Sequence, residues 1–497
     1  MPTLDAAIDR INAGPRGAHI GAFFDFDGTL IDGYSVGEFY KHRLRQREVG
    51  WGEAALLLLQ GLQGVATRER FTAFVKQGFK AYKGQTVEQM QALGEQLFSK
   101  AIANRLFPEA WRLVQAHQRM GHTLVVASSA TRFQIEPMAR ELGIPHVLCT
   151  AVEVRRGVLT GRIAGEVAWG EGKAAAVRAL AARRRIDLTR SHAYANGDED
   201  LAFLQTAGLP CAINPQPALA AAAQAQAWPV LQFAARAGTP ELRTAARSVA
   251  AYTGMAWAAA LGIGAGWLGG GRRDAVNLAA TLTSEVGLAL AGIRLNVQGE
   301  QHLWAARPAV FVFNHQSQLD LLIMAKLLRQ DFSGVAKMHT KNVPGFGPFL
   351  QFAGVAFVEP GAGQQNRRAL EPALHKLAQG LSMAMAPEGT RSATPRLGAF
   401  RKGAFHLARQ AGVPIVPVVL RNAGDLLRRG ELALRAGSVD VQVLPPVPTA
   451  GWRAADIDTH VARVRQMFVD TLEAWSAPAP PPPGHRLPAV DAEGSLR

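Results

Sequence analysis

The sequence contains few cysteines, few acidic residues and no long apolar run at its N-terminus. Only two of its 497 residues are cysteines, Cys149 and Cys211, which excludes a disulfide framework for a protein of this size. No cluster of cysteines and histidines has the spacing of zinc ligands, so we expect no structural zinc site. The opening residues, MPTLDAAIDRINAGPRG, lack the apolar core of a signal peptide. These absences favour a reducing, cytosol-facing setting.

The charge of the chain is unbalanced. It carries 54 basic and 39 acidic residues, a formal net charge of +15, which favours anionic partners. The usual classes of anionic partner are nucleic acid, phosphorylated metabolites and an anionic membrane face. The arginines are scattered and no aromatic platform or interleaved basic stripe accompanies them, so we expect no nucleic-acid binding.

Strand-like and helix-like patterns alternate in two parts of the chain. Residues 1–235 contain the strand-like runs TLVVASS and HAYANG between helical patterns, and residues 33–106 form a helical insertion. Residues 297–475 repeat the alternation with AVFVFN, GVAFVE, SMAMAPEG and VPIVPVVL. Such alternation predicts α/β domains with parallel, doubly wound sheets, whose ligands lie at the carboxyl ends of the strands. The proline-rich residues 476–497 are expected to be disordered.

The segment between the two domains, residues 236–296, is strongly apolar. Residues 248–271 carry no charge over a length sufficient to span a bilayer, and a weaker apolar stretch follows, which Glu285 interrupts. Four arginines flank the uncharged segment: Arg243, Arg247, Arg272 and Arg273. We therefore expect an apolar helical hairpin at the cytoplasmic face of the cell membrane, inserted in one leaflet or crossing twice. The alternative is a buried helical pair.

The first predicted strand ends in the motif DFDGT. Asp25 and Asp27 are two residues apart, so both point to the same side of an extended chain. Such a pair can serve as nucleophile and general acid–base, and its oxygens suit Mg²⁺. Ser128 and Ser129 end another strand and can bind phosphoryl oxygens. Lys173 begins a helix, where its charge can neutralise a developing anion.

These motifs, in this order, resemble the haloacid dehalogenase superfamily in its phosphoserine-phosphatase-like branch, subfamily IB. The resemblance covers about residues 18–235 and implies a Rossmann-like doubly wound sheet, a helical cap and Mg²⁺-dependent phosphomonoester hydrolysis. It implies Asp25 as the phosphorylated nucleophile, Asp27 as the general acid–base and Lys173 as the stabilising cation.

The same resemblance implies the ligands of phosphate and metal. The phosphate binders are Thr29, Ser128 and Ser129. The metal ligands are Asp25, Asp27, Asn196, Asp198 and Asp200. The family commonly carries aspartate where this chain has Asn196, so Asp198 is an alternative ligand through a shifted loop.

The segment FNHQSQLD follows an apolar, β-prone run. A short turn can bring the carboxylate of Asp320 to the imidazole of His315, where it would fix the tautomer and stabilise the imidazolium. No reactive serine or cysteine is evident as a covalent nucleophile, so we expect His315 to activate a substrate hydroxyl as a general base. Downstream, APEGTRS places Arg391 at a strand-end turn suited to a phosphate.

These residues resemble the glycerolipid acyltransferase family, specifically the 1-acylglycerol-3-phosphate acyltransferases, over about residues 297–445. The resemblance implies that His315, oriented by Asp320, deprotonates the sn-2 hydroxyl of a lysophosphatidate. That oxygen then attacks the thioester of acyl-CoA or acyl carrier protein, which gives phosphatidate. The implied acceptor-phosphate site is Glu388, Gly389, Thr390 and Arg391.

The chain departs from this family at one position. Pro360 stands where the family usually has an arginine, and Arg367 or Arg368 can replace that charge, or the acceptor is another lysolipid. The expected protein is a bifunctional enzyme of phospholipid synthesis whose partners are acyl-CoA, lysophosphatidate and membrane phospholipids. The alternative is an acyltransferase for another lysolipid with a catalytically weak, regulatory N-terminal domain.

Overall fold

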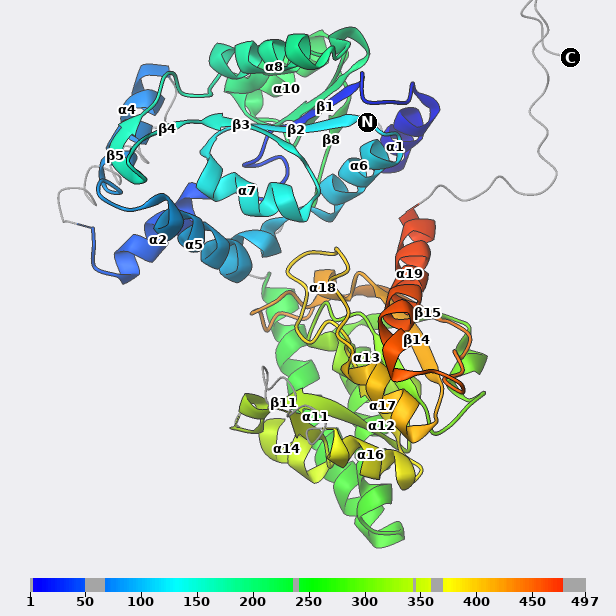
Figure 1. Ribbon diagram of the computed structural model, residues 1–497. Coiled ribbons are helices and arrows are strands. Elements are labelled where there is room, and N and C mark those ends of the chain that lie inside the picture. Colours follow the sequence, from blue (N-terminus) through cyan, green and yellow to red (C-terminus); the bar gives the residue numbers. More distant parts are fainter. Residues whose placement is uncertain (1–2, 50–67, 236–240, 343–345, 359–369, 477–497) are drawn as a thin grey trace, which may run out of the picture.

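Two α/β domains are joined by a helical hairpin in the computed structural model of the chain (Figure 1). The structure describes residues 3–49, 68–235, 241–342, 346–358 and 370–476. Three positions singled out in the sequence, Pro360, Arg367 and Arg368, lie outside the described residues, as does the proline-rich segment beyond Ser476.

The N-terminal domain is built on a parallel six-stranded sheet of order β3-β2-β1-β6-β7-β8. Its strands are β1 (Gly21–Phe24), β2 (Thr123–Thr131), β3 (His146–Thr150), β6 (His192–Ala195), β7 (Leu209–Ile213) and β8 (Val230–Leu231). Alternate residues of β1 point to opposite faces, and Phe23 and Phe24 are both fully buried because helices cover the two sides. This confirms the predicted doubly wound sheet.

Helices cover both faces of this sheet. One face, with Phe24, packs on α1 (Leu4–Ala13), α6 (Pro108–Arg119) and α7 (Arg132–Glu141). The other face, with Phe23, packs on α8 (Glu171–Arg184), α9 (Leu201–Leu204) and α10 (Pro217–Ala225). Figure 1 shows α8 and α10 above the sheet and α6 and α7 below it.

Within the described residues, the predicted helical insertion consists of α2 (Val36–Arg45), α4 (Arg68–Lys80) and α5 (Val87–Leu97), followed by a π-helix, Phe98–Ile102, and a 3₁₀-helix, Ala103–Arg105. The run HVLCTAVEV forms two strands, β3 and β4. Its second half, β4 (Val152–Arg155), leaves the sheet and pairs antiparallel with β5 (Val158–Ile163). The turn residues Arg156 and Gly157 both have positive φ, 50° and 78°, which is the conformation of a tight two-residue hairpin.

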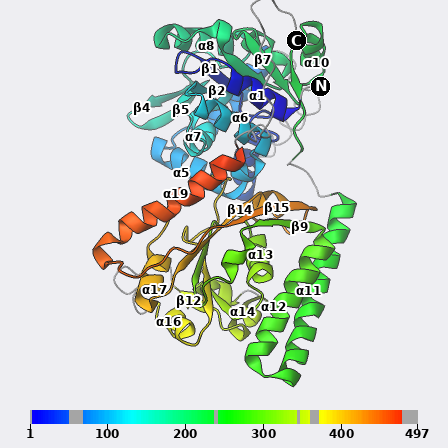
Figure 2. The same ribbon diagram turned by 90° about the vertical axis from the view of Figure 1, so that its right-hand side faces the viewer.

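The apolar segment forms a hairpin of α11 (Leu242–Gly269) and α12 (Arg272–Ala291). The two helices approach closely through small residues: a Cβ on Gly262 would lie 2.5 Å from Ala279 Cα, and one on Gly266 2.2 Å from Ala275 Cα. Figure 2 shows the hairpin along one side of the C-terminal domain. Among the described helices, α11 alone is long and apolar enough to cross a membrane.

The C-terminal domain has a seven-stranded sheet of order β12-β11-β13-β10-β14-β15-β9. The four strands predicted from the sequence are β10 (Val310–Phe313), β12 (Ala356–Val358), β13 (Ser382–Met385) and β14 (Ile415–Arg421). Three more, β9 (Ile293–Gln298), β11 (Phe332–Lys337) and β15 (Gly437–Val443), were not predicted. The sheet is parallel except that β14 and β15 pair antiparallel. Its helices are α13 (Leu319–Leu328), α14 (Phe346–Phe352), α16 (Glu371–Ala378), α17 (Gly403–Ala411), α18 (Ala423–Leu426) and α19 (Ile457–Ser476).

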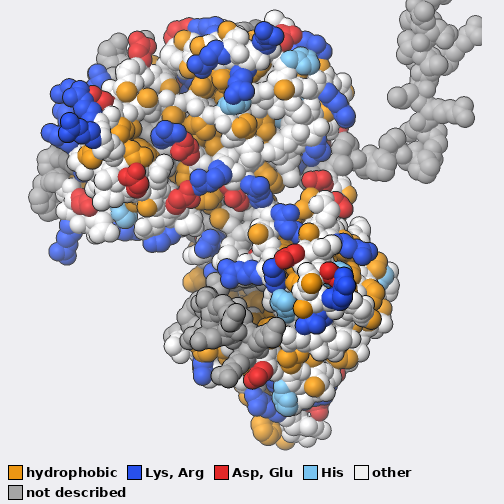
Figure 3. Space-filling model, in the orientation of Figure 1, with side chains coloured by type: hydrophobic (Ala, Val, Ile, Leu, Met, Phe, Trp, Pro, Cys, Tyr) orange, Lys and Arg blue, Asp and Glu red, His pale blue; other side chains and the backbone are white. Residues whose placement is uncertain are grey.

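The two domains touch through α7 and the cap. Thr394 Oγ1 donates to the Glu141 carboxylate at 2.6 Å, and the Arg396 guanidinium donates to the Glu141 carbonyl at 2.9 Å. Asn104 Nδ2, at the end of the cap, donates to the Arg429 carbonyl at 2.8 Å. Figure 3 shows Lys and Arg side chains gathered where the two domains approach each other.

Candidate active sites

The carboxylate of Asp25 lies directly beyond β1 and is paired with a buried lysine. Lys173 Nζ, from the first turn of α8, donates to Asp25 Oδ1 at 2.8 Å and to Asp200 Oδ1 at 2.5 Å. All three residues are buried. Burial alone would lower the pKa of Lys173, but the two carboxylates outweigh it and raise that pKa above its ordinary value. Lys173 therefore remains a cation beside the predicted nucleophile.

Asp27 is held by the first turn of the cap. Its Oδ1 accepts a hydrogen bond from the Ser35 amide at 2.7 Å, and its Oδ2 accepts one from Ser35 Oγ at 3.2 Å. Burial raises the pKa of Asp27 to about 7, although the hydrogen bonds from Ser35 lower it in part. A carboxyl group with this pKa can carry a proton near neutral pH, as a general acid must.

The hydroxyl of Thr29 contacts two side-chain oxygens that suit a hard cation, one from Asp25 and one from Asn196. Its Oγ1 lies 3.3 Å from Asp25 Oδ2 and 3.1 Å from Asn196 Oδ1. A Cβ on Gly28, whose φ is +77°, would lie 2.2 Å from Asn196 Nδ2, so this close approach requires glycine. Carboxylate and amide oxygens are ligands that Mg²⁺ prefers, so Asp25 and Asn196 fit the predicted metal. Asp200 lies near Asp25 because Lys173 Nζ donates a hydrogen bond to both carboxylates.

The alternative ligand Asp198 does not join this group. Its side chain is exposed, and its Oδ1 accepts a hydrogen bond from the Leu219 amide at 2.8 Å. This carboxylate therefore satisfies a free amide in the first turn of α10 instead of facing Asp25. The next residue, Glu199, was not predicted to belong to the site. Burial raises its pKa, and it lies close enough to Lys173 and Asp25 for their charges to affect that pKa as well.

The two predicted serines lie in β2 beside β1. Val126 pairs with Phe24, so Ser128 and Ser129 reach the carboxyl edge of the sheet at the level of the DFDGT turn. The buried Ser128 Oγ accepts a hydrogen bond from the Ala130 amide at 3.2 Å, which leaves its proton available to a phosphoryl oxygen. Ser129 is half-buried, and its carbonyl accepts a hydrogen bond from Thr150 Oγ1. Among the described contacts its hydroxyl has no hydrogen bond.

In the C-terminal domain, His315 follows β10 and Asp320 lies in the first turn of α13. His315 Nδ1 donates to Asp320 Oδ2 at 2.8 Å, and the amides of Gln316 and Ser317 donate to the same oxygen at 2.7 and 2.8 Å. Asp320 is fully buried, whereas the His315 side chain is 20% exposed. The carboxylate therefore fixes the tautomer and leaves His315 Nε2 for a substrate.

Glu388, predicted to shape the phosphate site, braces the histidine loop. Its Oε1 accepts a hydrogen bond from the His315 amide at 2.8 Å, and its Oε2 accepts bonds from Ser392 Oγ at 2.6 Å and the Gly398 amide at 2.8 Å. The Ser392 amide donates to the His315 carbonyl at 2.8 Å. Both carboxylate oxygens are occupied, and through the His315 amide Glu388 holds the backbone of the histidine in place.

The PEGTRS turn presents basic groups near this histidine. Gly389 has a φ of +70°, and a Cβ there would lie 2.8 Å from Arg401 Nε, so glycine allows Arg401 to pack over the turn. Thr390 is exposed and Arg391 is half-buried. Burial lowers the pKa of Arg391, and the nearby charge of Arg429 lowers it further, whereas that of Asp320 raises it. Arg429 was not predicted from the sequence.

Sequence models of two families match the chain: haloacid dehalogenase-like hydrolase over residues 22–205 and acyltransferase over residues 294–421. The chain belongs to the haloacid dehalogenase-like hydrolases and carries an acyltransferase domain as well. A phosphoserine phosphatase of Mycobacterium tuberculosis is 32% identical over 256 residues, 48% of this chain and 81% of that protein.

The acyltransferase half has its own relatives. The 1-acyl-sn-glycerol-3-phosphate acyltransferase alpha of Ovis aries is 38% identical over 188 residues, 38% of this chain and 66% of that protein. The chain thus spans just under two thirds of the length of this relative. The solved 1-acyl-sn-glycerophosphate acyltransferase of Thermotoga maritima is 20% identical with a TM-score of 0.42, covering 48% of this chain and 98% of that chain.

Proposed function

We propose that the C-terminal domain transfers an acyl group from acyl-CoA or acyl carrier protein to the sn-2 hydroxyl of 1-acylglycerol-3-phosphate, which yields phosphatidate. The observation that carries this proposal is the pair of His315 and the buried Asp320, 2.8 Å apart. No described residue hydrogen-bonds to His315 Nε2, so that atom is available to a substrate hydroxyl.

We propose the following steps for the reaction. His315 Nε2 removes the proton of the acceptor hydroxyl while the oxygen attacks the thioester carbonyl. Asp320 is buried, so water does not screen its charge, and it stabilises the imidazolium. As the carbon–sulfur bond breaks, the imidazolium returns the proton to the leaving thiolate, so His315 ends neutral and the acyl group ends on oxygen.

Arg391 and Arg429 are the proposed partners of the acceptor phosphate. Ser317 Oγ donates to the Leu427 carbonyl at 2.6 Å, which places the loop that carries Arg429 beside the histidine loop. Each arginine raises the electrostatic cost of charge on the other, and a phosphate dianion would relieve that repulsion. Arg429 thus offers a second cation in place of the arginine that Pro360 replaces.

We further propose that α11 holds this site at the cytoplasmic face of the cell membrane. Val249, Trp257, Leu261 and Leu268 are 65%, 67%, 65% and 93% exposed and recur at helical spacing on one side of α11. The other helix, α12, is bound to the domain by the ion pair of Glu285 and Lys326 at 2.6 Å. This arrangement favours a hairpin lying in one leaflet over one that crosses twice.

For the N-terminal domain we propose Mg²⁺-dependent hydrolysis of a phosphomonoester. Asp25 attacks phosphorus, Asp27 protonates the departing alkoxide, and Asp27 then takes a proton from the water that cleaves the aspartyl phosphate. Lys173 offsets the added negative charge. Bound Mg²⁺, held by Asp25 and Asn196, would supply further charge neutralisation of the phosphoryl group.

The alternative is a catalytically weak domain that serves a regulatory role, and Asn196 favours it. An amide oxygen carries no net charge, so Mg²⁺ affinity is lower than with the carboxylate usual in the family. Phosphatase assays over a range of Mg²⁺ concentrations separate the two readings. Asn196→Asp should lower the Mg²⁺ concentration for half-maximal activity, whereas a domain without activity in either form supports the regulatory role.

The acyltransferase proposal is tested with detergent-purified protein, labelled acyl-CoA and a panel of lysolipid acceptors. We expect acylation of 1-acylglycerol-3-phosphate in the wild type and none in His315→Ala. Arg429→Ala should raise KM for this acceptor more than for lysophosphatidylcholine, because only the former presents a phosphate dianion. Preference of the wild type for another lysolipid would contradict the proposed acceptor.

A further inference from the structure

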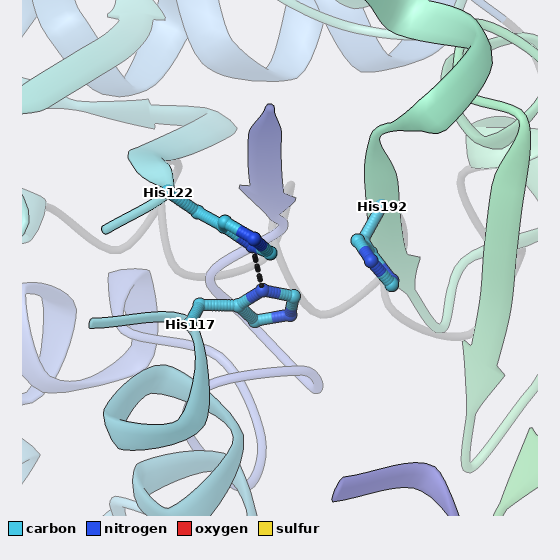
Figure 4. A group of neighbouring side chains, drawn as sticks. All are labelled: His117, His122 and His192. Atoms are coloured by element: carbon cyan, nitrogen blue, oxygen red, sulfur yellow. Dashed lines mark hydrogen bonds between the residues drawn. The ribbon is translucent and has the colours of Figure 1, made fainter. Parts of the chain in front are cut away.

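Three histidines of the N-terminal domain lie together at the amino edge of the sheet. His117 is in the last turn of α6, His122 precedes β2, and His192 opens β6, where it pairs with Ala22 of β1 (Figure 4). One ring nitrogen of each lies within 4.8 Å of those of the other two. Asp25 lies beyond the opposite, carboxyl end of β1, so this cluster is separate from the phosphatase site.

Hydrogen bonds fix the role of the His122 ring and allow either neutral tautomer of His117. His122 Nε2 lies 2.8 Å from the Pro15 carbonyl, which only accepts, so this nitrogen carries the proton and Nδ1 has the free lone pair. His117 Nδ1 lies 2.8 Å from that Nδ1, and His117 Nε2 lies 2.9 Å from the Tyr194 hydroxyl. With His122 Nδ1 as the acceptor, His117 Nδ1 carries the proton between the two rings and His117 Nε2 accepts from Tyr194. If the His117 proton moves to Nε2 and is donated to the Tyr194 oxygen, the lone pairs of both Nδ1 atoms are free and face the same point.

His192 is the ring without a partner. It stands beside the other two, with its centroid 4.7 Å from that of His117 and 6.0 Å from that of His122, and no described group hydrogen-bonds to it. Because no described residue engages either ring nitrogen of His192, its unprotonated nitrogen is available to a metal ion. Burial lowers the pKa of all three histidines, so at neutral pH each is in the uncharged form that binds metal.

We propose that His117, His122 and His192 bind a divalent transition metal ion that prefers imidazole nitrogen, such as Zn²⁺. Tetrahedral Zn²⁺ with Zn–N distances of about 2.0 Å sets its ligand nitrogens about 3.3 Å apart. The two Nδ1 atoms would separate by about half an ångström from their hydrogen-bonded distance, and His192 would move toward them. Pro15 and Tyr194 already occupy the outer nitrogens, as the partners of metal-bound histidines usually do.

Such an ion would tie together α6 and the starts of β2 and β6, so its effect is on stability and not on catalysis. The expectation of no structural zinc site rested on spacing along the chain. His117 and His122 are five residues apart, but the third ligand lies seventy residues further on. Only the adjacency of β1, β2 and β6 in the sheet brings the three together.

The test is a Co²⁺ titration of the full chain without an affinity tag, stripped of metal by EDTA and held in excess Mg²⁺ to fill carboxylate sites. We expect visible d–d absorption that saturates at one Co²⁺ per chain and is lost on addition of Zn²⁺. His192→Gln should abolish it, whereas His146→Gln, a half-buried histidine at the start of β3 outside the cluster, and Asp25→Asn should retain it. No absorption in the wild type, or full absorption in His192→Gln, overturns the proposal.

A second measurement covers the case in which His192→Gln fails to fold. X-ray absorption of the Zn²⁺-loaded wild type should report imidazole nitrogens at about 2.0 Å. Its melting temperature should also rise by several degrees over that of the metal-free protein, because the ion binds only the folded chain. A shell of oxygen ligands alone, or a melting temperature unchanged by Zn²⁺, overturns the proposal.

Discussion

The substitution Asp320→Asn removes the charge beside His315 with little change of shape. Three hydrogen bonds converge on Asp320 Oδ2, at 2.7 to 2.8 Å from their donors, and an amide oxygen can accept all three. The amide nitrogen would take the place of Oδ1, which is buried without a hydrogen-bond partner. The substitution therefore tests the charge of Asp320 more than its packing.

The expected loss can be estimated from the burial of the pair. Removing one charge of a buried ion pair costs about 3–5 kcal/mol, and the imidazolium of His315 is such a partner once it forms. Each 1.36 kcal/mol of barrier is tenfold in rate, so kcat for acyl transfer should fall about 10²- to 10⁴-fold. KM should change little, because the imidazole is neutral before the proton is transferred.

Steady-state acylation of lysophosphatidate by purified variants measures this loss. Asp458→Asn is the matched control, since its carboxylate is 73% exposed in a surface pair with Lys402 and should leave kcat unchanged. The double variant His315→Ala/Asp320→Asn should be no slower than His315→Ala alone, because the two residues act as a unit. Unchanged kcat in Asp320→Asn, or additive losses in the double variant, would refute the reasoning.

Four further perturbations have defined outcomes. Glu388→Gln turns an amide toward the three donors that now bind its carboxylate, so kcat for acylation should fall about tenfold or more at constant phosphatase activity; equal activity would remove its positioning role. Lys173→Met should lower phosphatase kcat by about 10²–10³ while acylation persists, and loss of both activities would point to misfolding instead. Gly262→Leu places a side chain against Ala279 Cα and should lower the free energy of unfolding by about 1–3 kcal/mol in chemical denaturation; an unchanged value would mean that the hairpin does not pack as described. In metal-free protein, burial lowers the pKa of His192 to about 4, so the unfolded chain binds a proton below its ordinary pKa of 6.5 that the folded chain does not. The free energy of unfolding should therefore be undiminished by His192 above pH 6.5 and fall as the pH is lowered toward 4. In His192→Gln that fall should be smaller by about 2 kcal/mol.

Local spacing explains why one site could be predicted from the sequence. His315 and Asp320 are separated by a single turn between a strand and a helix, so their contact is set within six residues. The motif at Asp25 and Asp27 is likewise local. Lys173 required knowledge of the motif order, because only the sheet brings the start of α8 to the end of β1.

Contacts between distant segments could not be predicted. The role of Glu388 depends on the amide of His315, 73 residues away, and the sequence indicated only that both belong to one site. The family resemblance offered Asp198 as an alternative metal ligand through a shifted loop, but the Leu219 amide in the first turn of α10 binds its carboxylate. Arg429 lies on a loop after β14 without a motif of its own, and only its proximity to Arg391 marks it.

Three strands were missed for a related physical reason. β9 and β15 lie at one edge of the C-terminal sheet and alternate buried with more exposed residues, unlike the continuous apolar runs of the central strands. β11 carries Gly334 in its middle, and a glycine in a strand interior weakens the strand signal. Their assignment depends on neighbouring strands that the sequence pattern does not identify.

The most direct test of two active sites in one chain is a single product analysis. Labelled lysophosphatidate, acyl-CoA and Mg²⁺ are incubated with the wild type, His315→Ala and Asp25→Asn, and the lipids are separated by chain number and headgroup. We predict acylated products in the wild type and Asp25→Asn and none in His315→Ala. Any lipid that the wild type dephosphorylates should keep its phosphate in Asp25→Asn. Acylation that survives in His315→Ala, or that disappears in Asp25→Asn despite a folded chain, would contradict the account.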